Sequence, residues 1–284
     1  MKKQLYTTIS FLGLACMISG CTLFGLDKQT DYDFQKSTLD AHINKSARQY
    51  LLDRGKNPVV SNDTIFKWMQ LGLEYAGIDL AEFDKPGRTF IFLKNEAIRV
   101  LPTRTTNGVV VATSNIPTAG MWFSFPLVSK NPDGTLKLKT DASVDGVPVR
   151  NWSDYPKEDV KNFFLSLIAT GDYGFGNGVT SNTSLPTLLT PGTSASDKSL
   201  LGWYAAGTTP NLNVSGDRIL NRVNVITPGQ VYGFDPESRL NFRIVSSDYS
   251  PLRYNDATNA ATAGLIATNG QIHVFAALIY PWRY

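Results

Sequence analysis

Apolar residues recur every third or fourth position in three segments of the chain, which is the period of an amphipathic helix. This spacing predicts helices over about 37–54 and 63–76, which end at Gly55 and Gly77, and a third helix that opens near Pro156. The three apolar stripes are Leu39, Ile43, Ala47, Tyr50 and Leu51; Ile65, Trp68, Met69, Gly72, Leu73 and Ala76; and Val160, Phe163, Phe164, Leu167 and Ile168. The candidate N-caps of the second helix are Ser61, Asn62 and Asp63.

Shorter apolar runs between turn residues predict β-strands. Residues 89–93 form a buried strand in this interpretation, and Asn95 caps a short helix over 96–101. Strand-like runs separated by Asn-Gly, Pro and Asp-Gly turns indicate a β-rich insertion at about 102–150. The runs of the insertion are 109–111, 121–125 and 136–140, and those of the C-terminal third are 219–226, 240–245, 264–268 and 271–279.

The last two runs are joined by Asn269-Gly270, the strongest hairpin signal of the chain, because a type I′ turn needs positive φ at both central residues. The final run is apolar at both alternating sets of positions, which predicts a strand covered on both faces and central in its sheet. Residues 172–217 are rich in turn-forming residues and are predicted to be mostly loop, with apolar breaks at 185–189 and 200–204. Helices and strands of this kind predict an α+β fold.

Residues 1–20 have the order of an export signal. Lys2 and Lys3 precede the apolar run 11–18, which is shorter than the roughly 20 residues that span a bilayer. Ile-Ser-Gly-Cys at 18–21 follows directly and resembles the lipobox of bacterial lipoproteins. The resemblance implies cleavage of the signal and lipid on Cys21, which anchors the chain to a membrane. The alternative is an ordinary secretory signal that contains a cysteine.

Removal of such a signal changes the composition of the chain. The 27 Lys and Arg residues stand against 24 Asp and Glu residues, and loss of Lys2 and Lys3 leaves 25 basic residues and a net charge of about +1. This balance gives a nucleic-acid partner no electrostatic support. Because Cys16 is lost with the signal, Cys21 is the only cysteine left, so no intramolecular disulfide is expected and stability must come from the hydrophobic core.

Residues 21–36 contain few large apolar side chains and are predicted to be a lipidated tether. The acidic residues of this stretch are Asp27, Asp31 and Asp33. In Bacteroidetes-like lipoproteins an acidic stretch after the cysteine can direct export to the cell surface, although a solvated linker has the same composition. The expected location is the outer membrane, at the cell surface or alternatively on its periplasmic face. Residues 37–284 are left for a single enlarged domain.

Two blocks of the chain resemble fasciclin (FAS1) domains. In the first block, the helix over 63–76 ends in an Ala-Gly pair and leads to the strand 89–93 and to Asn-Glu-Ala-Ile at 95–98. In the closing block, Asn-Gly at 269–270 precedes Ile-His-Val at 272–274, with a proline near the end of the chain. The resemblance implies a FAS1-like twisted β-sheet sandwich with packed helices, enlarged here by the β-rich insertion.

A middle block, 163–173 followed by Leu-Pro-Thr-Leu-Leu at 185–189, resembles in outline the middle helix of the same family and the strand after it. Two features depart from the family pattern. Leu167 stands where the family usually has a histidine, and the domain is larger than a usual FAS1 unit. We therefore do not assign the adhesion residues of the FAS1 family to positions in this chain.

The sequence contains no recognisable catalytic set. His273 lies in the closing block, where the resemblance implies a structural role, and His42 falls on the polar side of the first predicted helix. With no cysteine available and no cluster at ligand spacing, no metal site is expected. No Gly-x-Ser-x-Gly elbow occurs, and the glycines at 174–178 follow a helix rather than a strand, so they are interpreted as a turn. We expect no catalytic residue, no metal and no cofactor.

Aromatic residues on predicted loops are the candidate contacts for a ligand or partner, because rings provide large contact areas at low entropic cost. The candidates are Trp122, Trp152, Tyr155, Trp203 and Tyr204. The alternative for each is an ordinary role in the core.

These features predict a non-catalytic cell-envelope lipoprotein that binds a partner, by family resemblance in adhesion or surface assembly. The expected partner is an envelope protein or an extracellular glycan or peptide. The main alternative is an accessory lipoprotein of a SusC/SusD-type outer-membrane uptake complex for glycans or peptides. A surface hydrolase with two facing carboxylates is a third hypothesis, although nothing in the sequence selects two of the 24 acidic residues.

Overall fold

A computed structural model of the 284-residue chain provides the fold. It describes residues 40–114, 127–128, 131–133, 137, 140, 146–147, 150–174, 182–189, 200–204, 240–244, 252–254, 258–277 and 279. Residues Ala41–Tyr284 form one compact unit, which contains all the elements described below. Cys21, the tether, Trp122 and the predicted runs 121–125 and 219–226 lie outside the described residues, as does most of 136–140.

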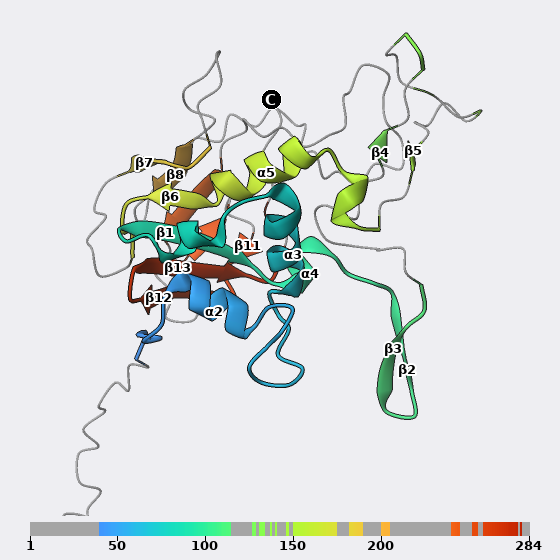
Figure 1. The fold of residues 1–284 in the computed structure, drawn as a ribbon, viewed down its shortest axis with the longest axis horizontal. Helices are drawn as coiled ribbons and strands as arrows, with labels where there is room; N and C mark the ends of the chain where they lie inside the picture. The colour runs from blue at the N-terminus through green and yellow to red at the C-terminus, as the bar shows by residue number, and fades with distance from the viewer. Residues whose placement is uncertain are drawn as a thin grey trace, which may run out of the picture. The chain divides into compact units, whose positions relative to one another are not determined.

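Helices, two mixed β-sheets and two separate two-stranded sheets make up the described part, which confirms the α+β class (Figure 1). The first sheet has the order β12-β13-β1-β6, formed by Thr262–Ala267, Gly270–Phe275, Arg88–Leu93 and Ile168–Thr170. β13 runs parallel to β1 and antiparallel to β12, and all six of its residues are buried. The prediction of a central final strand covered on both faces is therefore confirmed.

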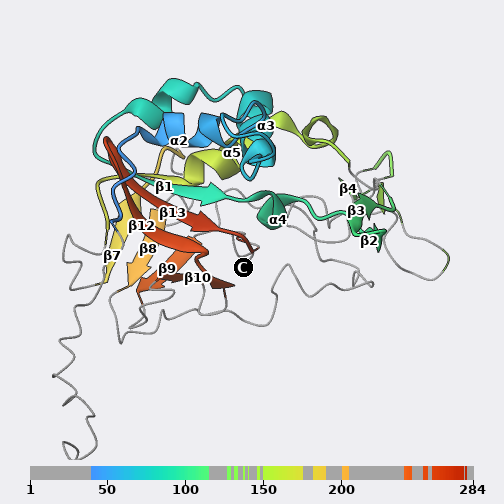
Figure 2. The same ribbon diagram turned by 90° about the horizontal axis from the view of Figure 1, so that it is seen from below.

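The second sheet has the order β11-β10-β9-β8-β7 and lies against the first (Figure 2). Its strands are β7 (Thr183–Pro186), β8 (Leu200–Tyr204), β9 (Leu240–Ile244), β10 (Leu252–Tyr254) and β11 (Thr258–Asn259). Aromatic rings join the two sheets, with Trp203 at 5.3 Å from His273 and Phe242 at 5.6 Å from Phe275 between ring centroids. A single bridge between Ala169 and Thr187 links their edges.

Helices cover the other face of the first sheet (Figure 2). The helices of this layer are α2 (Ala47–Asp53), α3 (Lys67–Ala76) and α5 (Lys157–Ser166), and the short helical turns are η1 (Leu80–Asp84), α4 (Asn95–Ile98) and η2 (Trp152–Asp154). α3 packs against α5 at Gly72, where the Phe164 ring approaches the helix backbone. A side chain at this position would separate the two helices.

The prediction of a helix over 37–54 is wrong for residues 40–46, because α2 begins only at Ala47. Residues 41–43 are extended instead, and His42 forms a parallel bridge with Ile266 of β12. The Ile43 amide donates to the Ile266 carbonyl at 3.0 Å, and the Ile266 amide donates to the Ala41 carbonyl at 2.8 Å. β12 is an edge strand with unpaired backbone groups, and these groups hold the segment in extended form.

The second predicted helix ends as expected at Gly77, whose φ of 70° is left-handed. Its start differs, because none of the predicted caps is used and the N-cap is Phe66, which makes no side-chain cap. The Asn95 Oδ1 atom instead accepts from the Trp68 amide at 3.0 Å, and its Nδ2 atom donates to the Thr64 carbonyl at 2.7 Å. Asn95 therefore caps α3 rather than its own short helix.

Three further predicted segments change class. Ile168 belongs to β6 and not to the third helix, because the Ile91 amide binds the Leu167 carbonyl at 2.9 Å and draws the chain alongside β1. The apolar breaks at 185–189 and 200–204 within the predicted loop provide β7 and β8, and the FAS1 resemblance implies a strand for the first of them. Pairing across the second sheet, which the local sequence does not reveal, makes them strands.

The type I′ turn lies at a different Asn-Gly pair from the one expected. Asn107 and Gly108 have φ of 51° and 76° and join β2 (Thr103–Thr106) to β3 (Val109–Ala112), within the predicted insertion. Near the end of the chain, Ala267 pairs with Gly270, so Thr268 and Asn269 are the loop residues. Only Gly270 has positive φ there, and a Cβ on it would lie 2.0 Å from the Arg88 carbonyl oxygen.

The insertion also contains the pair β4 (Leu127–Val128) and β5 (Gly146–Val147).

Gly72→Ala tests the contact between α3 and α5. A Cβ at this position would lie 2.4 Å from the Phe164 ring and 2.8 Å from the Trp152 ring. Alanine favours the helix by about 1 kcal/mol, but overpacking of the core costs about 1–3 kcal/mol. We therefore expect a lower free energy of unfolding in urea, whereas exposed Lys67→Ala in the same helix should change it by less than about 0.5 kcal/mol. An unchanged or higher stability of Gly72→Ala would contradict the packing described.

Candidate functional site

The predicted aromatic contacts lie mostly in the core and not on open loops. Trp152 is 4 % exposed, donates from Nε1 to the Trp68 carbonyl at 2.9 Å and packs edge-on against Phe164. Tyr155 is 8 % exposed, and burial raises the pKa of its phenol. Its backbone carbonyl accepts from the Tyr75 hydroxyl at 2.6 Å. These rings hold the start of α5 against α3 and offer no face to a ligand.

Trp203 is also a core residue, with no exposed surface, because β8 places it between the two sheets. Its neighbour Tyr204 is half-buried, as expected for the opposite face of a strand. The expectation of loop aromatics open to a ligand is thus corrected for Trp152, Tyr155 and Trp203, and the structure does not describe Trp122. Trp203 and Tyr204 were predicted to lie on a loop because turn-forming residues flank the segment on both sides, but the segment forms β8.

His273 is fully buried in β13 and hydrogen-bonded on both ring nitrogens. Its Nδ1 atom accepts from the Gly264 amide at 3.0 Å, so the proton lies on Nε2, which is 3.1 Å from the Tyr173 carbonyl. Burial lowers the pKa of His273 to about 4, against a weaker opposing effect of the Tyr173 carbonyl. The ring is therefore neutral near pH 7 and holds β12 and the segment after β6 to β13.

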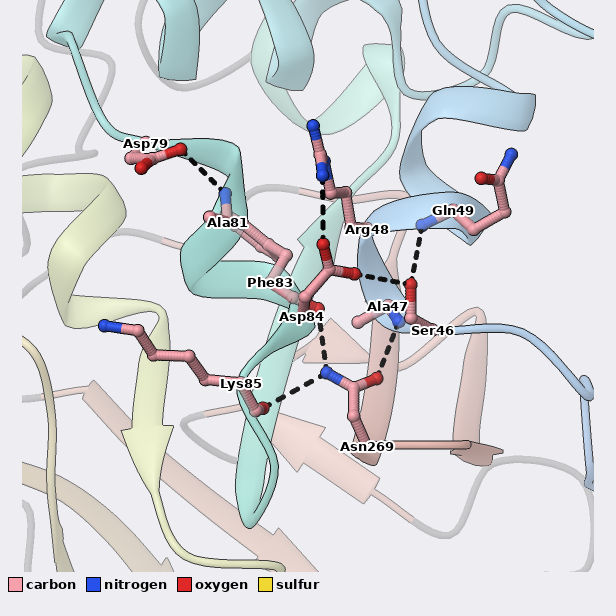
Figure 3. Close-up of polar contacts among 10 residues, drawn as sticks. All are labelled: Ser46, Ala47, Arg48, Gln49, Asp79, Ala81, Phe83, Asp84, Lys85 and Asn269. Atoms are coloured by element: carbon pink, nitrogen blue, oxygen red, sulfur yellow. Dashed lines mark hydrogen bonds and ion pairs between the residues drawn. The ribbon is translucent and has the colours of Figure 1, made fainter.

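The buried side-chain amide of Asn269 lies at the centre of a polar junction between three segments of the chain (Figure 3). The Asn269 Oδ1 atom accepts from the Ala47 amide at 2.9 Å, in the first turn of α2. Its Nδ2 atom donates to the carbonyls of Phe83 at 2.8 Å and Lys85 at 3.1 Å, at the end of η1. Asn269 is buried, with 8 % of the residue exposed. Its amide thus joins the turn between β12 and β13 to two helical elements.

Asp84 lies beside this junction and is held by α2 (Figure 3). It accepts from the Ser46 hydroxyl at 2.7 Å and from Arg48 Nη1 at 3.0 Å. The Ser46 hydrogen bond, followed by Arg48, lowers the pKa of Asp84. Ser46 also accepts from the Gln49 amide and so caps α2. These groups satisfy one another, so the cluster has the character of a structural joint and not of a reaction centre.

The other perturbed carboxylates have similar structural roles. Lys45 lowers the pKa of Asp53, Lys85 and Arg88 lower that of Glu82, and backbone amides lower that of Asp154. Asp159 differs, because burial and its neighbour Glu158 raise its pKa. These two residues are consecutive on α5, and consecutive side chains of a helix do not face each other. They do not form the facing pair that a glycosidase needs.

Neither a metal cluster nor a membrane-spanning helix occurs in the described part of the chain. Within those residues, no group of three or more His, Cys, Asp or Glu side chains is placed to hold a metal ion. Over the same residues, none of the helices has the length and apolar content needed to cross a bilayer.

The hairpin β2–β3 is the candidate interaction surface. Every residue of both strands is exposed. Among the described residues, the exposed large apolar side chains are Val59, Val60, Val109, Val110 and Val111. Three of them are thus consecutive on one strand, at 60 %, 65 % and 38 % exposure. The sequence predicted this strand and its Asn-Gly turn, but not that both of its faces are left uncovered.

Comparisons with known proteins do not identify a relative. No protein-family model matches the chain, and no curated protein sequence matches it.

The depressed pKa of His273 predicts an acid sensitivity. The unfolded chain takes up the histidine proton below pH 6.5, whereas the folded protein resists protonation down to about pH 4. The free energy of unfolding should therefore fall by about 1.4 kcal/mol per pH unit between these values, about 3 kcal/mol in total. Urea unfolding at pH 7, 5.5 and 4 measures this loss. In His273→Asn the free energy of unfolding should fall less steeply over this interval, by about 1.4 kcal/mol per pH unit. Parallel plots of the free energy of unfolding against pH for the two proteins would contradict the assignment.

The Asn269 amide should contribute strongly to stability. In Asn269→Ala the Ala47 amide and the carbonyls of Phe83 and Lys85 lose their partners, and each buried unsatisfied group costs about 1–3 kcal/mol. We expect urea unfolding to show a loss of about 2–4 kcal/mol. The matched control is Thr268→Ala, because its side chain is exposed in the same turn. Equal effects of the two substitutions would show that the amide does not hold the junction.

Proposed function

We propose that this protein is a non-catalytic cell-envelope lipoprotein, anchored by lipid on Cys21, that binds a partner in surface assembly or adhesion. The observation that carries the proposal is the exposed aliphatic hairpin β2–β3. An exposed apolar patch on a folded domain is typical of an interaction site, because water contact with such a patch is unfavourable. The order of basic residues, apolar run, small residues and cysteine at 1–21 supports the anchor.

The same proposal includes a FAS1-like domain. Its support is that the three sequence blocks that resemble this family meet in one sheet. The first block provides α3, β1 and α4, the middle block provides the second half of α5 and β6, and the closing block provides β13 and the end of β12. The second part of the middle block, 185–189, overlaps β7 of the second sheet instead. β1 lies between β13 and β6 and hydrogen-bonds to both. Blocks that are distant in sequence thus form one core, as expected for a family-defining unit.

The domain has two functional ends in this proposal. The chain enters at the edge of β12, where residues 41–45 bond to Ile266 and Thr268 near the N-terminal end of β1. The hairpin follows α4, which continues from the opposite end of β1 (Figures 1 and 2). About 20 residues separate Cys21 from Ala41 and span at most about 70 Å. In this proposal a lipid on Cys21 attaches the domain through the segment that pairs with β12, and the hairpin follows the other end of β1.

Substitution of Cys21 tests the anchor in Gram-negative cells that lipidate exported proteins. The natural chain should sediment with membranes, and Cys21→Ser should move to the soluble fraction by a factor of about 10 or more, because acyl chains add about 0.8 kcal/mol per buried CH₂. Cys16→Ser is the matched control, because this cysteine lies inside the apolar run and should not affect fractionation. Continued sedimentation of Cys21→Ser in carbonate-washed membranes would contradict lipid anchoring.

Partner binding is tested by chemical cross-linking of intact cells followed by purification of the protein. We expect a cross-linked envelope protein, either another protein or a second copy of this chain, to be recovered with the natural chain and to be lost at least five-fold with Val110→Lys, which places a charge on the hairpin. The control is Lys67→Ala, on the exposed side of α3. Recovery of a TonB-dependent transporter with a SusD-like lipoprotein would assign the uptake complex instead, and recovery that does not depend on Val110 would exclude the hairpin as the contact.

A further inference from the structure

We propose that the outer edge of β3 pairs antiparallel with β3 of a second copy of this chain, so that two hairpins form one four-stranded sheet. This inference names the partner of the hairpin and therefore rests on the proposed function. Three features carry it: the register of the hairpin, the different chemistry of its two edges and the symmetry of the resulting pair.

The hairpin is incomplete as a sheet. It consists of two strands of four residues that pair only with each other within the described structure. A two-stranded hairpin is at best marginally stable in water, and a third strand is usually needed. The register places Val109 opposite Thr106 and Val110 opposite Thr105, on opposite faces. Because both faces carry valine, packing on one face alone would leave the other exposed, whereas a strand added at the edge gives every valine a neighbour.

The two edges of the hairpin differ in chemistry. β2 contains Arg104 and three threonines, and a charged residue on an edge strand opposes the addition of another strand. β3 contains three valines and an alanine, with no charge, proline or glycine to protect it. Its outer edge has no paired strand among the described residues. Strand addition is therefore favoured at β3 and disfavoured at β2.

A second copy fits this edge because β3 is complementary to itself. In an antiparallel pair about a two-fold axis, aliphatic side chains oppose aliphatic side chains on both faces, and the contact is the same for each copy. The two Arg104 residues lie on the outer strands, three strand spacings or about 14 Å apart. That distance exceeds the Debye length of about 8 Å at physiological salt, so their repulsion is screened. The new sheet ends at β2 on both sides, which closes the assembly at two copies.

The contact between the two β3 strands is small, and a small contact forms only where the two copies are concentrated. Two strands of four residues bury far less than the roughly 1,600 Å² of a standard interface. In dilute solution we therefore expect little association. Two copies anchored in one membrane have a much higher effective concentration, which converts a weak contact into a populated one. The assembly is accordingly expected at the membrane and not in solution.

Site-directed cross-linking of the full-length anchored protein tests this pairing. Single cysteines at Val109, Val110 or Val111 are oxidised in isolated membranes, where the natural cysteine is blocked by lipid. A two-fold pair places at least one of these positions near its copy, within the Cα separation of about 7 Å that a disulfide allows. Thr105→Cys is the matched control, because Thr105 opposes Val110 on β2 and would lie about 14 Å from its copy. We expect at least ten-fold more disulfide-linked dimer from the best β3 cysteine than from Thr105→Cys.

A photo-reactive residue at Val110 separates failure of this inference from failure of the proposed function. Each variant is first shown to be membrane-bound and to unfold at the natural urea concentration. An adduct of twice the chain mass supports self-pairing. An adduct of any other mass overturns self-pairing and leaves the proposed function in place, with a different partner. Absence of any adduct, together with equal cysteine cross-linking at β3 and β2, overturns both.

Discussion

The Asn269 side chain is the contact on which the helical layer depends. It joins the turn between β12 and β13 to the first turn of α2 and to the end of η1. Asp84 adds polar contacts between η1 and α2, because it accepts from Ser46 and Arg48. α2 has seven residues, and a helix of that length does not form alone in water. The amide supplies its first turn with an acceptor, and Ser46 supplies another. A single residue in a β-turn thus determines where a helix distant in sequence begins.

That junction also sets how the chain enters the domain. α2 begins at Ala47, and residues 41–43 before it are extended and pair with the edge of β12. This arrangement covers an edge strand of the first sheet. At the other end of β1 the chain leaves through α4 into a hairpin whose edge is uncovered among the described residues. The edge of β12 is therefore covered by residues 41–43, whereas the outer edge of β3 has no paired strand among the described residues.

The candidate aromatic contacts that the structure describes lie mostly in the core. Trp152, Tyr155 and Trp203 fill the helix interface and the space between the sheets, and His273 is held neutral by burial between two hydrogen bonds. The perturbed carboxylates of the described residues are, apart from Asp159, stabilised by neighbouring donors. The exposed large apolar side chains of the described residues are aliphatic, and three of them are consecutive on β3.

Elements with local signals could be predicted from the amino-acid sequence. The apolar period predicted α3, its end at Gly77 and most of α5, and the uniformly apolar final run predicted a central β13. The valine strand and the Asn-Gly turn of the hairpin could also be predicted from the sequence, because a type I′ turn depends on two adjacent residues. The remaining features arise only from tertiary contacts. Asn95 caps a helix 27 residues away, Asn269 reaches an amide 222 residues away, and Trp203 is buried only because another sheet lies over it. These outcomes depend on which distant backbone groups need a partner, and the local pattern does not contain that information.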